Sequence, residues 1–226
     1  MNRSLHVRTA IKFLQLPLIV GLFLFLPAGT LRWWQGWLFV AVFFLGSLAL
    51  TVYLAITDPK LLERRLNAGP RAEKEKSQKI IMVVAMTSFA LTLTLPAIDH
   101  RLGWSHVPGV VVILGNLMIV CGLLGVSWVF RENTYSASTI QLAEGQEVIS
   151  TGPYAIIRHP MYSAGLLMLA GVPLALGSWW GLLTIVTNTA AIVWRLLDEE
   201  RFLLRNLAGY RDYARRVSHR LVPLVW

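Results

Sequence analysis

Charged residues and cysteine are both scarce in this sequence. Only 15% of the 226 residues are charged, whereas a soluble domain carries about 25%. The single cysteine, Cys121, lies in an apolar stretch and cannot form an intramolecular disulfide. These shortages exclude an ordinary soluble domain and a secreted disulfide scaffold. Because 55% of the chain is hydrophobic and the apolar residues form long blocks, the sequence predicts an integral membrane protein.

Motifs that bind metals or nucleotides are also missing. His6, His100, His106 and His219 have no partner at the spacing of metal ligands, and neither CxxC nor HExxH occurs. No P-loop or GxGxxG follows an expected strand, and there is no GxSxG. The formal charge is +9, but the basic residues lie between apolar blocks, where they set orientation and attract anionic lipid headgroups. We therefore expect membrane lipids as partners, no nucleic acid and no metal.

Apolar runs occur six times along the chain. They span residues 13–26, 37–56, 80–97, 107–130, 161–176 and 179–197. The first run follows basic residues, as in a signal peptide, but a second run comes almost at once, so we expect a retained helix. The expected fold class is all-α and integral to the membrane, with about five to six hydrophobic helices.

The distribution of basic residues predicts the orientation. All of the 21 Lys and Arg residues except Arg32 and Arg101 fall on one side of a six-segment topology. Because cytoplasmic loops are enriched in basic residues, both termini are expected in the cytoplasm. The short chain and its excess of Arg over Lys suit the inner (cell) membrane of a bacterium. The charged connection of residues 60–79 is expected to be a solvated connector.

The last two apolar runs differ from the first four. Residues 161–176 contain Pro173 and meet residues 179–197 across a short connection at Gly177. At 1.5 Å per residue the first run reaches only about 24 Å, less than the roughly 30 Å of a hydrocarbon core. We expect a tight helical hairpin whose first arm does not fully cross the membrane.

One polar cluster directly precedes this hairpin. A turn is expected at Pro153, and His159 is expected to cap a helix whose first residue is Pro160, a position that proline favours. Tyr162 follows three residues after His159 and can face the same side. The unpaired N–H groups of such a helix start, together with Arg158 and His159, could hold a carboxylate or phosphate. The alternative is that Arg158 and His159 only anchor the hairpin among lipid headgroups.

A second polar cluster lies where the last segment leaves the membrane. Asp198, Glu199 and Glu200 are three consecutive carboxylates at a helix C-terminus, where they oppose the macrodipole, and this favours a functional role. Arg195 and Glu199 are spaced for an ion pair, whereas an unpaired carboxylate could accept hydrogen bonds from ribose hydroxyls. Antiparallel packing of the hairpin would bring this cluster close to residues 159–162. The sequence therefore predicts one composite site at the cytoplasmic boundary.

Taken together, these motifs resemble the isoprenylcysteine carboxyl methyltransferase family. That family belongs to a broader group of integral membrane methyltransferases that includes phospholipid N-methyltransferases. The resemblance is carried by Gly152-Pro153-Tyr154, Arg158-His159-Pro160-Met161-Tyr162, Glu199-Glu200 and Gly209-Tyr210 with Tyr213 and Pro223. It runs from about residue 148 to the C-terminus, and the first four segments match only in hydropathy.

The resemblance implies a methyltransferase with S-adenosyl-L-methionine as its cofactor and a lipophilic small molecule or lipidated substrate as acceptor. It implies a cofactor pocket made by Tyr154, Arg158, His159, Tyr162, Glu199 and Glu200. We expect Glu199 rather than Glu200 to hold the ribose, and we expect Arg195 and Arg131 to orient the acceptor. The chain would then consist of a four-helix membrane region, residues 1–130, and a unit of cofactor-binding loop, hairpin and amphipathic tail, residues 131–226.

The acceptor is not readable from the sequence. A carboxylate, as in an isoprenylcysteine or another small lipophilic acid, is already a nucleophile at neutral pH and leaves positioning and desolvation to raise the rate. An amine or thiol acceptor, as in a phospholipid or small-molecule N- or S-methyltransferase, would need a base such as His159 or a glutamate. Two other classes stay open. One is an NADPH-dependent membrane reductase, because sterol reductases end in a similar region, and the other is a non-enzymatic membrane protein.

Overall fold

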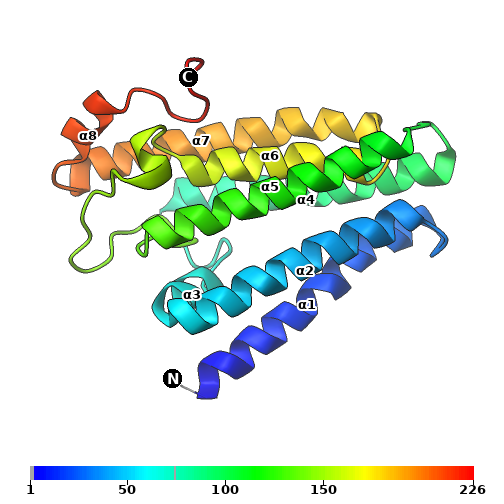
Figure 1. Cartoon of the computed structure of the whole chain (residues 1–226), viewed down its shortest axis with the longest axis horizontal. Coiled ribbons are helices and arrows are strands. Elements are labelled where there is room, and N and C mark those ends of the chain that lie inside the picture. The colour runs from blue at the N-terminus through cyan, green and yellow to red at the C-terminus, as the bar shows by residue number, and fades with distance from the viewer. Residues whose placement is uncertain (1–2, 74) are drawn as a thin grey trace.

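The protein is all-helical in the described residues, 3–73 and 75–226, of a computed structural model (Figure 1). The side chains of Arg3, Ser4 and His6 lie outside the described part. Within it are eight α-helices, two short 3₁₀ helices and no strand. Five helical regions are long and apolar enough to cross a membrane, so the predicted all-α membrane fold is confirmed. The elements are α1 (Arg3–Ala28), α2 (Trp34–Thr57), α3 (Pro59–Leu66), α4 (Lys76–Leu102), α5 (Gly109–Glu132), η1 (Gly152–Ala155), α6 (Pro160–Ala175), η2 (Trp180–Leu183), α7 (Thr184–Asn206) and α8 (Tyr210–Arg216).

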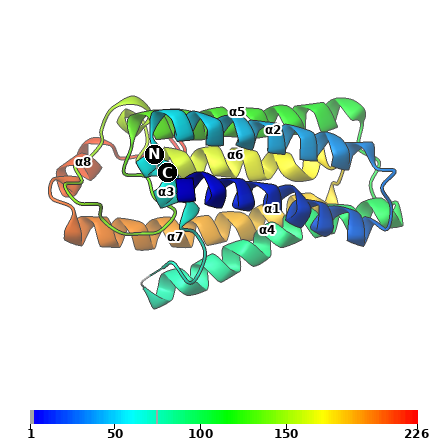
Figure 2. The ribbon, with the colours of Figure 1, turned by 90° about the horizontal axis from the view of Figure 1, so that it is seen from below.

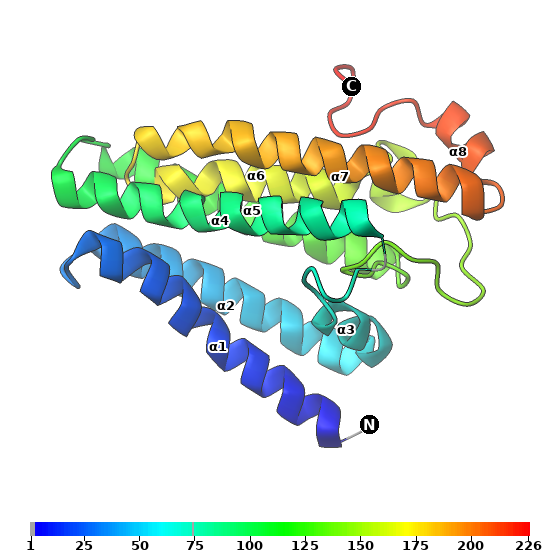
Figure 3. The same ribbon diagram turned by 180° about the vertical axis from the view of Figure 1, so that it is seen from behind.

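The long helices run side by side along the longest axis of the molecule (Figures 1 and 2). The short helices α3 and α8 lie at one end of this bundle, together with the loop that follows α5 (Figures 1 and 3). The start of α1 lies toward the same end (Figure 3). Which side of the membrane this end faces stays a prediction from the charge distribution.

Glycines let α5 and α6 approach each other closely. A Cβ atom at Gly115 would lie 2.3 Å from the backbone nitrogen of Ala175, and one at Gly122 would lie 2.8 Å from the carbonyl oxygen of Ala164. Gly171 of α6 faces Gly115 in the same way. Small residues allow such backbone contact between membrane helices. As a result α6 contacts α5 more extensively than it contacts α7, its predicted hairpin partner.

The hairpin of α6 and α7 has the short first arm that the sequence predicts. With 16 residues, α6 is about 24 Å long. Gly177 ends it with a φ of 75°, a conformation that glycine adopts without strain. The chain then forms the 3₁₀ turn η2 before α7 begins, so the expected apolar run from residue 179 starts as a turn.

The connection of residues 60–79 is not the solvated connector that its charge predicts. Asp58 caps α3 by accepting a hydrogen bond from the Leu61 N–H group at 2.9 Å. Leu61 and Leu62 are buried and pack with Phe130 of α5. The prediction was wrong for α3, because Leu61, Leu62 and Leu66 fall on one face of this helix and pack in the same apolar cluster.

A polar cluster closes the end of the bundle opposite to α3 and α8. Asp99 is only 1% exposed and accepts hydrogen bonds from the Ser105 N–H group at 2.8 Å, from the Ser105 hydroxyl at 2.6 Å and from the Ser178 hydroxyl. The N–H groups of Trp179 and Gly181 in turn donate to the two serine oxygens. This cluster fastens α4 to the turn between α6 and α7.

Candidate functional site

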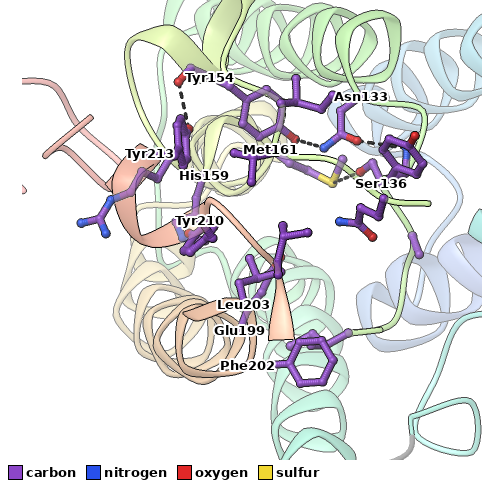
Figure 4. Close-up of a pocket in the computed structure, with 18 of the residues that line it drawn as sticks. Asn133, Ser136, Tyr154, His159, Met161, Glu199, Phe202, Leu203, Tyr210 and Tyr213 are labelled. Carbon is purple, nitrogen blue, oxygen red and sulfur yellow. Dashed lines mark hydrogen bonds between the residues drawn. The ribbon is translucent and has the colours of Figure 1, made fainter. Parts of the chain in front are cut away.

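A cavity opens at the end of the bundle that carries α3 and α8 (Figure 4). It contains about 910 Å³ of empty space, its open mouth included. Its wall comes from the loop after α5, the start of α6, the last turns of α7, and α8. Six of the predicted site residues line it: Tyr154, Arg158, His159, Tyr162, Arg195 and Glu199.

Glu199 and Tyr162 join the two arms of the hairpin at this cavity. The Tyr162 hydroxyl donates a hydrogen bond to Glu199 Oε2 at 2.6 Å, although 37 residues separate them in the chain. The rings of His159 and Tyr162 lie 5.7 Å apart between centroids, as expected for residues three apart at a helix start. The structure thus brings together the two polar clusters that the sequence places at the ends of the hairpin.

Glu200 has different surroundings from Glu199. It is 5% exposed and does not line the cavity. Its Oε1 atom lies 2.8 Å from Arg158 Nη1 and 3.2 Å from His159 Nε2, and its Oε2 atom lies 2.9 Å from Arg220 Nε. Three basic side chains therefore surround one buried carboxylate. This arrangement ties α7 to the start of α6 and to the C-terminal segment.

The C-terminal segment covers the start of α6. Carbonyl oxygens of residues 219–221 accept hydrogen bonds from the N–H groups of Arg158 at 2.9 Å and His159 at 3.0 Å, and from the Ser163 hydroxyl at 2.6 Å. The tail thus occupies the two backbone N–H groups directly before α6. The tail from Phe202 was expected to be an amphipathic helix, but residues 202–206 continue α7, α8 covers Tyr210–Arg216, and the residues after α8 are extended or turned.

Arg195 lines the cavity, but the residues that bind its guanidinium do not line it. Its Nη2 atom lies 2.9 Å from Oε1 of Glu73, which is only 3% exposed, and it also donates to the Ser138 carbonyl oxygen at 2.8 Å. Its Nη1 atom donates to Gln78 Oε1 at 3.0 Å. Among the described residues, no ion pair joins Arg195 to Glu199, although their spacing allows one. The guanidinium thus ties α7 to the loop after α5 and to the connection between α3 and α4.

Arg131 does not face the cavity, contrary to expectation. It is exposed in the last turn of α5 and is not among the lining residues. Its neighbour Phe130 is buried, and Asn133 lines the cavity. Because each residue turns a helix by about 100°, Arg131 points away from the side that these two neighbours occupy.

Aromatic side chains form the wall near α8 (Figure 4). The Tyr213 hydroxyl donates to the Tyr154 carbonyl oxygen at 2.9 Å, and Asn133 Nδ2 donates to the Tyr154 hydroxyl at 2.9 Å. Burial raises the pKa of Tyr154 to about 12 and raises the pKa of Tyr210 and Tyr213 well above the usual value. All three phenols are therefore neutral at physiological pH.

Two polar atoms of the lining residues are buried without a partner among the described residues. These atoms are Arg158 Nε and the Tyr210 hydroxyl. Buried polar groups normally have a hydrogen-bond partner, so both atoms are candidates for contact with a bound molecule. No group of three or more His, Cys, Asp or Glu side chains in the described part is arranged to hold a metal ion.

The sequence did not reveal Glu73 or Arg220 as parts of this region. Glu73 sits in a run of mixed charge that is typical of a solvated loop, and Arg220 is one arginine among several in the tail. The sequence offers one indication, because Glu200 and Arg195 would each need a side chain of opposite charge once they are buried. It does not indicate which residue supplies that charge.

Comparison with known proteins matches residues 110–209 to the family described as phospholipid methyltransferase. The predicted resemblance to the integral membrane methyltransferases is confirmed for this part of the chain. The match begins within α5, whereas the sequence motifs suggested a start near residue 148. Helix α5, which packs closely on α6, therefore belongs to the matched region as well.

Three curated relatives match stretches of 105 to 133 residues. The chain is 28% identical over 133 residues to a nickel-cobalt-cadmium resistance protein of Alcaligenes xylosoxydans xylosoxydans and 31% identical over 106 residues to a cobalt-zinc-cadmium resistance protein of Cupriavidus metallidurans. It is 29% identical over 105 residues to the mouse Delta(14)-sterol reductase. These matches cover 52%, 44% and 43% of this chain, and 62%, 47% and 25% of the respective relatives.

Proposed function

We propose that the protein transfers a methyl group from S-adenosylmethionine to a lipophilic acceptor, and the similarity of residues 110–209 to the phospholipid methyltransferase family supports this proposal. The favoured reaction is carboxyl O-methylation of an isoprenylcysteine-like or other small lipophilic acid. The observation that carries the proposal is the cavity in which Glu199 and Tyr162 meet. It lies at the end of a membrane bundle, where a water-soluble cofactor and a bilayer-borne acceptor can reach the same space.

The polar atoms of the cavity fit this cofactor. Glu199, which Tyr162 holds in place, would accept hydrogen bonds from the ribose hydroxyls. Arg158 would bind the methionine carboxylate through its unpartnered Nε atom, and the Tyr210 hydroxyl is a second unpartnered contact. When bound, S-adenosylmethionine supplies a methyl group activated by its positively charged sulfur. Glu200 is assigned the separate task of holding Arg158 and His159 in position.

The surrounding residues favour an acceptor that needs no base. His159 Nε2 is directed at Glu200 at 3.2 Å, and the phenols near α8 stay protonated. A carboxylate is already ionised at neutral pH, so positioning and exclusion of water are the main contributions left to the protein. The aromatic wall excludes water on the side of α8. Phospholipid or small-molecule N- or S-methylation would require His159 to leave Glu200 and act as a base.

We also propose a cellular location for the protein and separate roles for its N-terminal and C-terminal parts. We place the protein in a bacterial inner membrane with the cavity facing the cytoplasm, because the basic residues gather at that end. Residues 131–226 would bind the cofactor and residues 1–130 would form the membrane scaffold. Arg195 would help to shape the acceptor side, while the exposed position of Arg131 gives that residue no contact with the cavity.

A second candidate is an NADPH-dependent membrane reductase, which the relationship to the mouse sterol reductase favours. We would expect a reductase to bind NADPH in the same cavity. The two candidates therefore differ in which soluble molecule binds, and one titration separates them.

The test is calorimetric titration of the detergent-purified full chain with S-adenosylhomocysteine, with NADPH as the second titrant. We expect the homocysteine product to bind and NADPH not to bind. Glu199→Gln should weaken the binding by about tenfold or more, because a charged acceptor is lost. Asp198→Asn is the matched control, since Asp198 accepts from the Ser77 hydroxyl at 3.0 Å outside the cavity.

The outcomes separate the candidates. Binding of NADPH alone would replace the methyltransferase proposal with the reductase. Binding of neither molecule would favour a non-enzymatic membrane protein. Equal binding by the two variants would remove Glu199 from the cofactor site.

A further inference from the structure

Two arginines line the cavity, and both pair with carboxylates that do not line it. Arg158 Nη1 lies 2.8 Å from Glu200 Oε1. Arg195 Nη2 lies 2.9 Å from Glu73 Oε1. Glu199 lines the cavity as well (Figure 4), and within residues 3–73 and 75–226 it forms no ion pair with either arginine. The charges of the two arginines are therefore neutralised from behind the wall, and Glu199 stays available to a bound molecule.

The spacing of Arg195 and Glu199 makes this arrangement unexpected. They are four residues apart on α7, so their side chains share one face of the helix and could pair. The charges of both act on the Tyr162 hydroxyl, which donates to Glu199 Oε2 at 2.6 Å. In the part of the chain that the structure describes, Glu199 Oε1 accepts no hydrogen bond. If Arg195 turned to this oxygen, it would compete with a ribose hydroxyl for it.

Glu73 supplies the carboxylate that holds Arg195 instead. It comes from the connection between α3 and α4, and it is only 3% exposed. An ion pair shielded from water in this way is attracted more strongly than a pair at the surface. Arg195 Nη2 also donates to the Ser138 carbonyl oxygen at 2.8 Å, and Nη1 donates to Gln78 Oε1 at 3.0 Å. Both terminal nitrogens of the guanidinium are thus engaged without Glu199.

We propose that Glu73 is a positioning residue of the cofactor site, a role that rests on the proposed function. By binding Arg195, Glu73 keeps Glu199 free to accept hydrogen bonds from the ribose. Glu73 acts through these two side chains and touches neither the cofactor nor the acceptor. Because it precedes residue 131, the N-terminal part of the chain contributes to the charge balance of the site as well as to the membrane scaffold.

The experiment is a set of calorimetric titrations of the detergent-purified full chain with S-adenosylhomocysteine. Glu73→Gln removes the charge but keeps an oxygen that can accept from Arg195 and from the Ile140 N–H group, which lies 3.3 Å from Glu73 Oε2. Glu73→Gln is also combined with Arg195→Gln and with Glu199→Gln. Glu75→Gln is the matched control, because Glu75 lies in the same connection, is exposed and makes no side-chain cap on α4.

We expect Glu73→Gln to weaken binding by about threefold to tenfold, because Arg195 then pairs with Glu199. Addition of Arg195→Gln should strengthen binding again by about threefold or more, since the competing cation is gone. Glu199→Gln should weaken binding about tenfold or more in the wild type but less than about threefold in the Glu73→Gln background, because both changes act on one contact. Glu75→Gln should match the wild type.

A role of Glu73 in holding only the loop at Ile140 predicts a different pattern. Removal of Arg195 would then bring no recovery, and Glu199→Gln would have the same effect in both backgrounds. Either result would overturn the proposed role, as would wild-type affinity of the Glu73→Gln variant.

Folding of the variants is checked by thermal unfolding in the same detergent. If Glu73→Gln alone does not fold, its combination with Arg195→Gln replaces it, since that variant leaves neither charge of the buried pair behind. It should bind S-adenosylhomocysteine at least about threefold more tightly than Glu199→Gln, and equally weak binding would contradict the role of Glu73. Failure of the proposed function itself is distinct, because the wild type would then not bind S-adenosylhomocysteine at all.

Discussion

The two ends of the helical bundle both carry buried carboxylates, but they use them differently. At one end Asp99 accepts three hydrogen bonds from Ser105 and Ser178, and the serine oxygens accept two more from the backbone. At the other end Glu200 is also buried, but Glu199 beside it faces a cavity. The Asp99 cluster is fully paired within the protein, whereas two atoms of the cavity lining, Arg158 Nε and the Tyr210 hydroxyl, have no partner in the described residues.

This difference shows where a binding site can lie. A buried polar group without a partner costs free energy, so it persists where a bound molecule supplies the missing contact. A fully paired cluster gains nothing from a ligand and contributes only to stability. The comparison predicts that substitutions at the closed end change stability alone, whereas substitutions around the cavity change stability and binding to different degrees.

The largest effect is expected for Glu200→Ala. It removes the one carboxylate shared by Arg158, His159 and Arg220, and loss of a buried counter-charge should lower the free energy of unfolding by about 3–5 kcal/mol. Chemical unfolding of the protein in detergent micelles measures this. Glu199→Gln is the control and should lose less than about 1 kcal/mol, because its neighbourhood is already open to the cavity. Equal stability of the two variants would contradict the separate assignments of these glutamates.

Asp99→Ala should have the next largest effect on stability. It leaves three donors of Ser105 and Ser178 unsatisfied inside the protein and should lower the free energy of unfolding by about 2–3 kcal/mol. Affinity for S-adenosylhomocysteine should be unchanged, because the cluster lies at the far end of the bundle. Unfolding curves and calorimetric titration of one preparation check both expectations. A large change in affinity would show that the two ends are coupled.

Tyr210→Phe should separate binding from stability. It removes a hydroxyl that has no partner, so the free energy of unfolding should stay the same or rise by less than about 1 kcal/mol. Affinity for S-adenosylhomocysteine should fall by about threefold to tenfold if a ligand supplies the missing partner. Tyr213→Phe is the matched control, since its hydroxyl donates to Tyr154 and its loss should reduce stability. A reduced stability of Tyr210→Phe would show that the hydroxyl already has a partner.

The ionisation of Tyr154 should leave the stability of the protein unchanged near neutral pH and lower it only at alkaline pH. Burial raises the pKa of Tyr154 from 10.0 to about 12, so the folded protein keeps this proton at pH values where the unfolded chain loses it. Its stabilising contribution is complete below pH 10 and is lost as the pH rises toward 12. Thermal unfolding midpoints between pH 8 and 12 measure this, and Tyr154→Phe should show a shallower decline. The same slope in both proteins would assign the decline to other groups.

The positions of the hydrophobic helices could be predicted from the sequence because bilayer burial imposes long apolar runs. The short length of α6 and its start at Pro160 follow from the same pattern and from the preference of proline for the first helical turn. Likewise, the contact between Tyr162 and Glu199 follows from the hairpin. These features depend on residues that are close in sequence or joined by one tight turn.

Other features could not be predicted because they depend on contacts between distant segments. The pairing of Arg195 with Glu73 and of Glu200 with Arg220 requires the tertiary arrangement of loops that have no hydrophobic pattern. The close approach of α5 and α6 is signalled by Gly115 and Gly122, but many helices contain glycine without such contact. Arg131 shows a different limit, since one position along a helix decides whether a side chain faces the cavity or the surroundings.

Because the C-terminal segment supplies contacts to the start of α6, the site can be completed only at the end of protein synthesis. Arg158 donates to the Ser218 carbonyl oxygen across 60 residues of chain, and Arg220 completes the surroundings of Glu200. At about 5–20 residues per second, the ribosome needs several seconds to pass from the first of these residues to the last. During that interval the membrane helices before them are already synthesised, while Arg158 and Glu200 still lack their final partners. A nascent chain that stops before residue 218 would therefore insert in the membrane with an unfinished site, in a form that quality-control proteases can recognise.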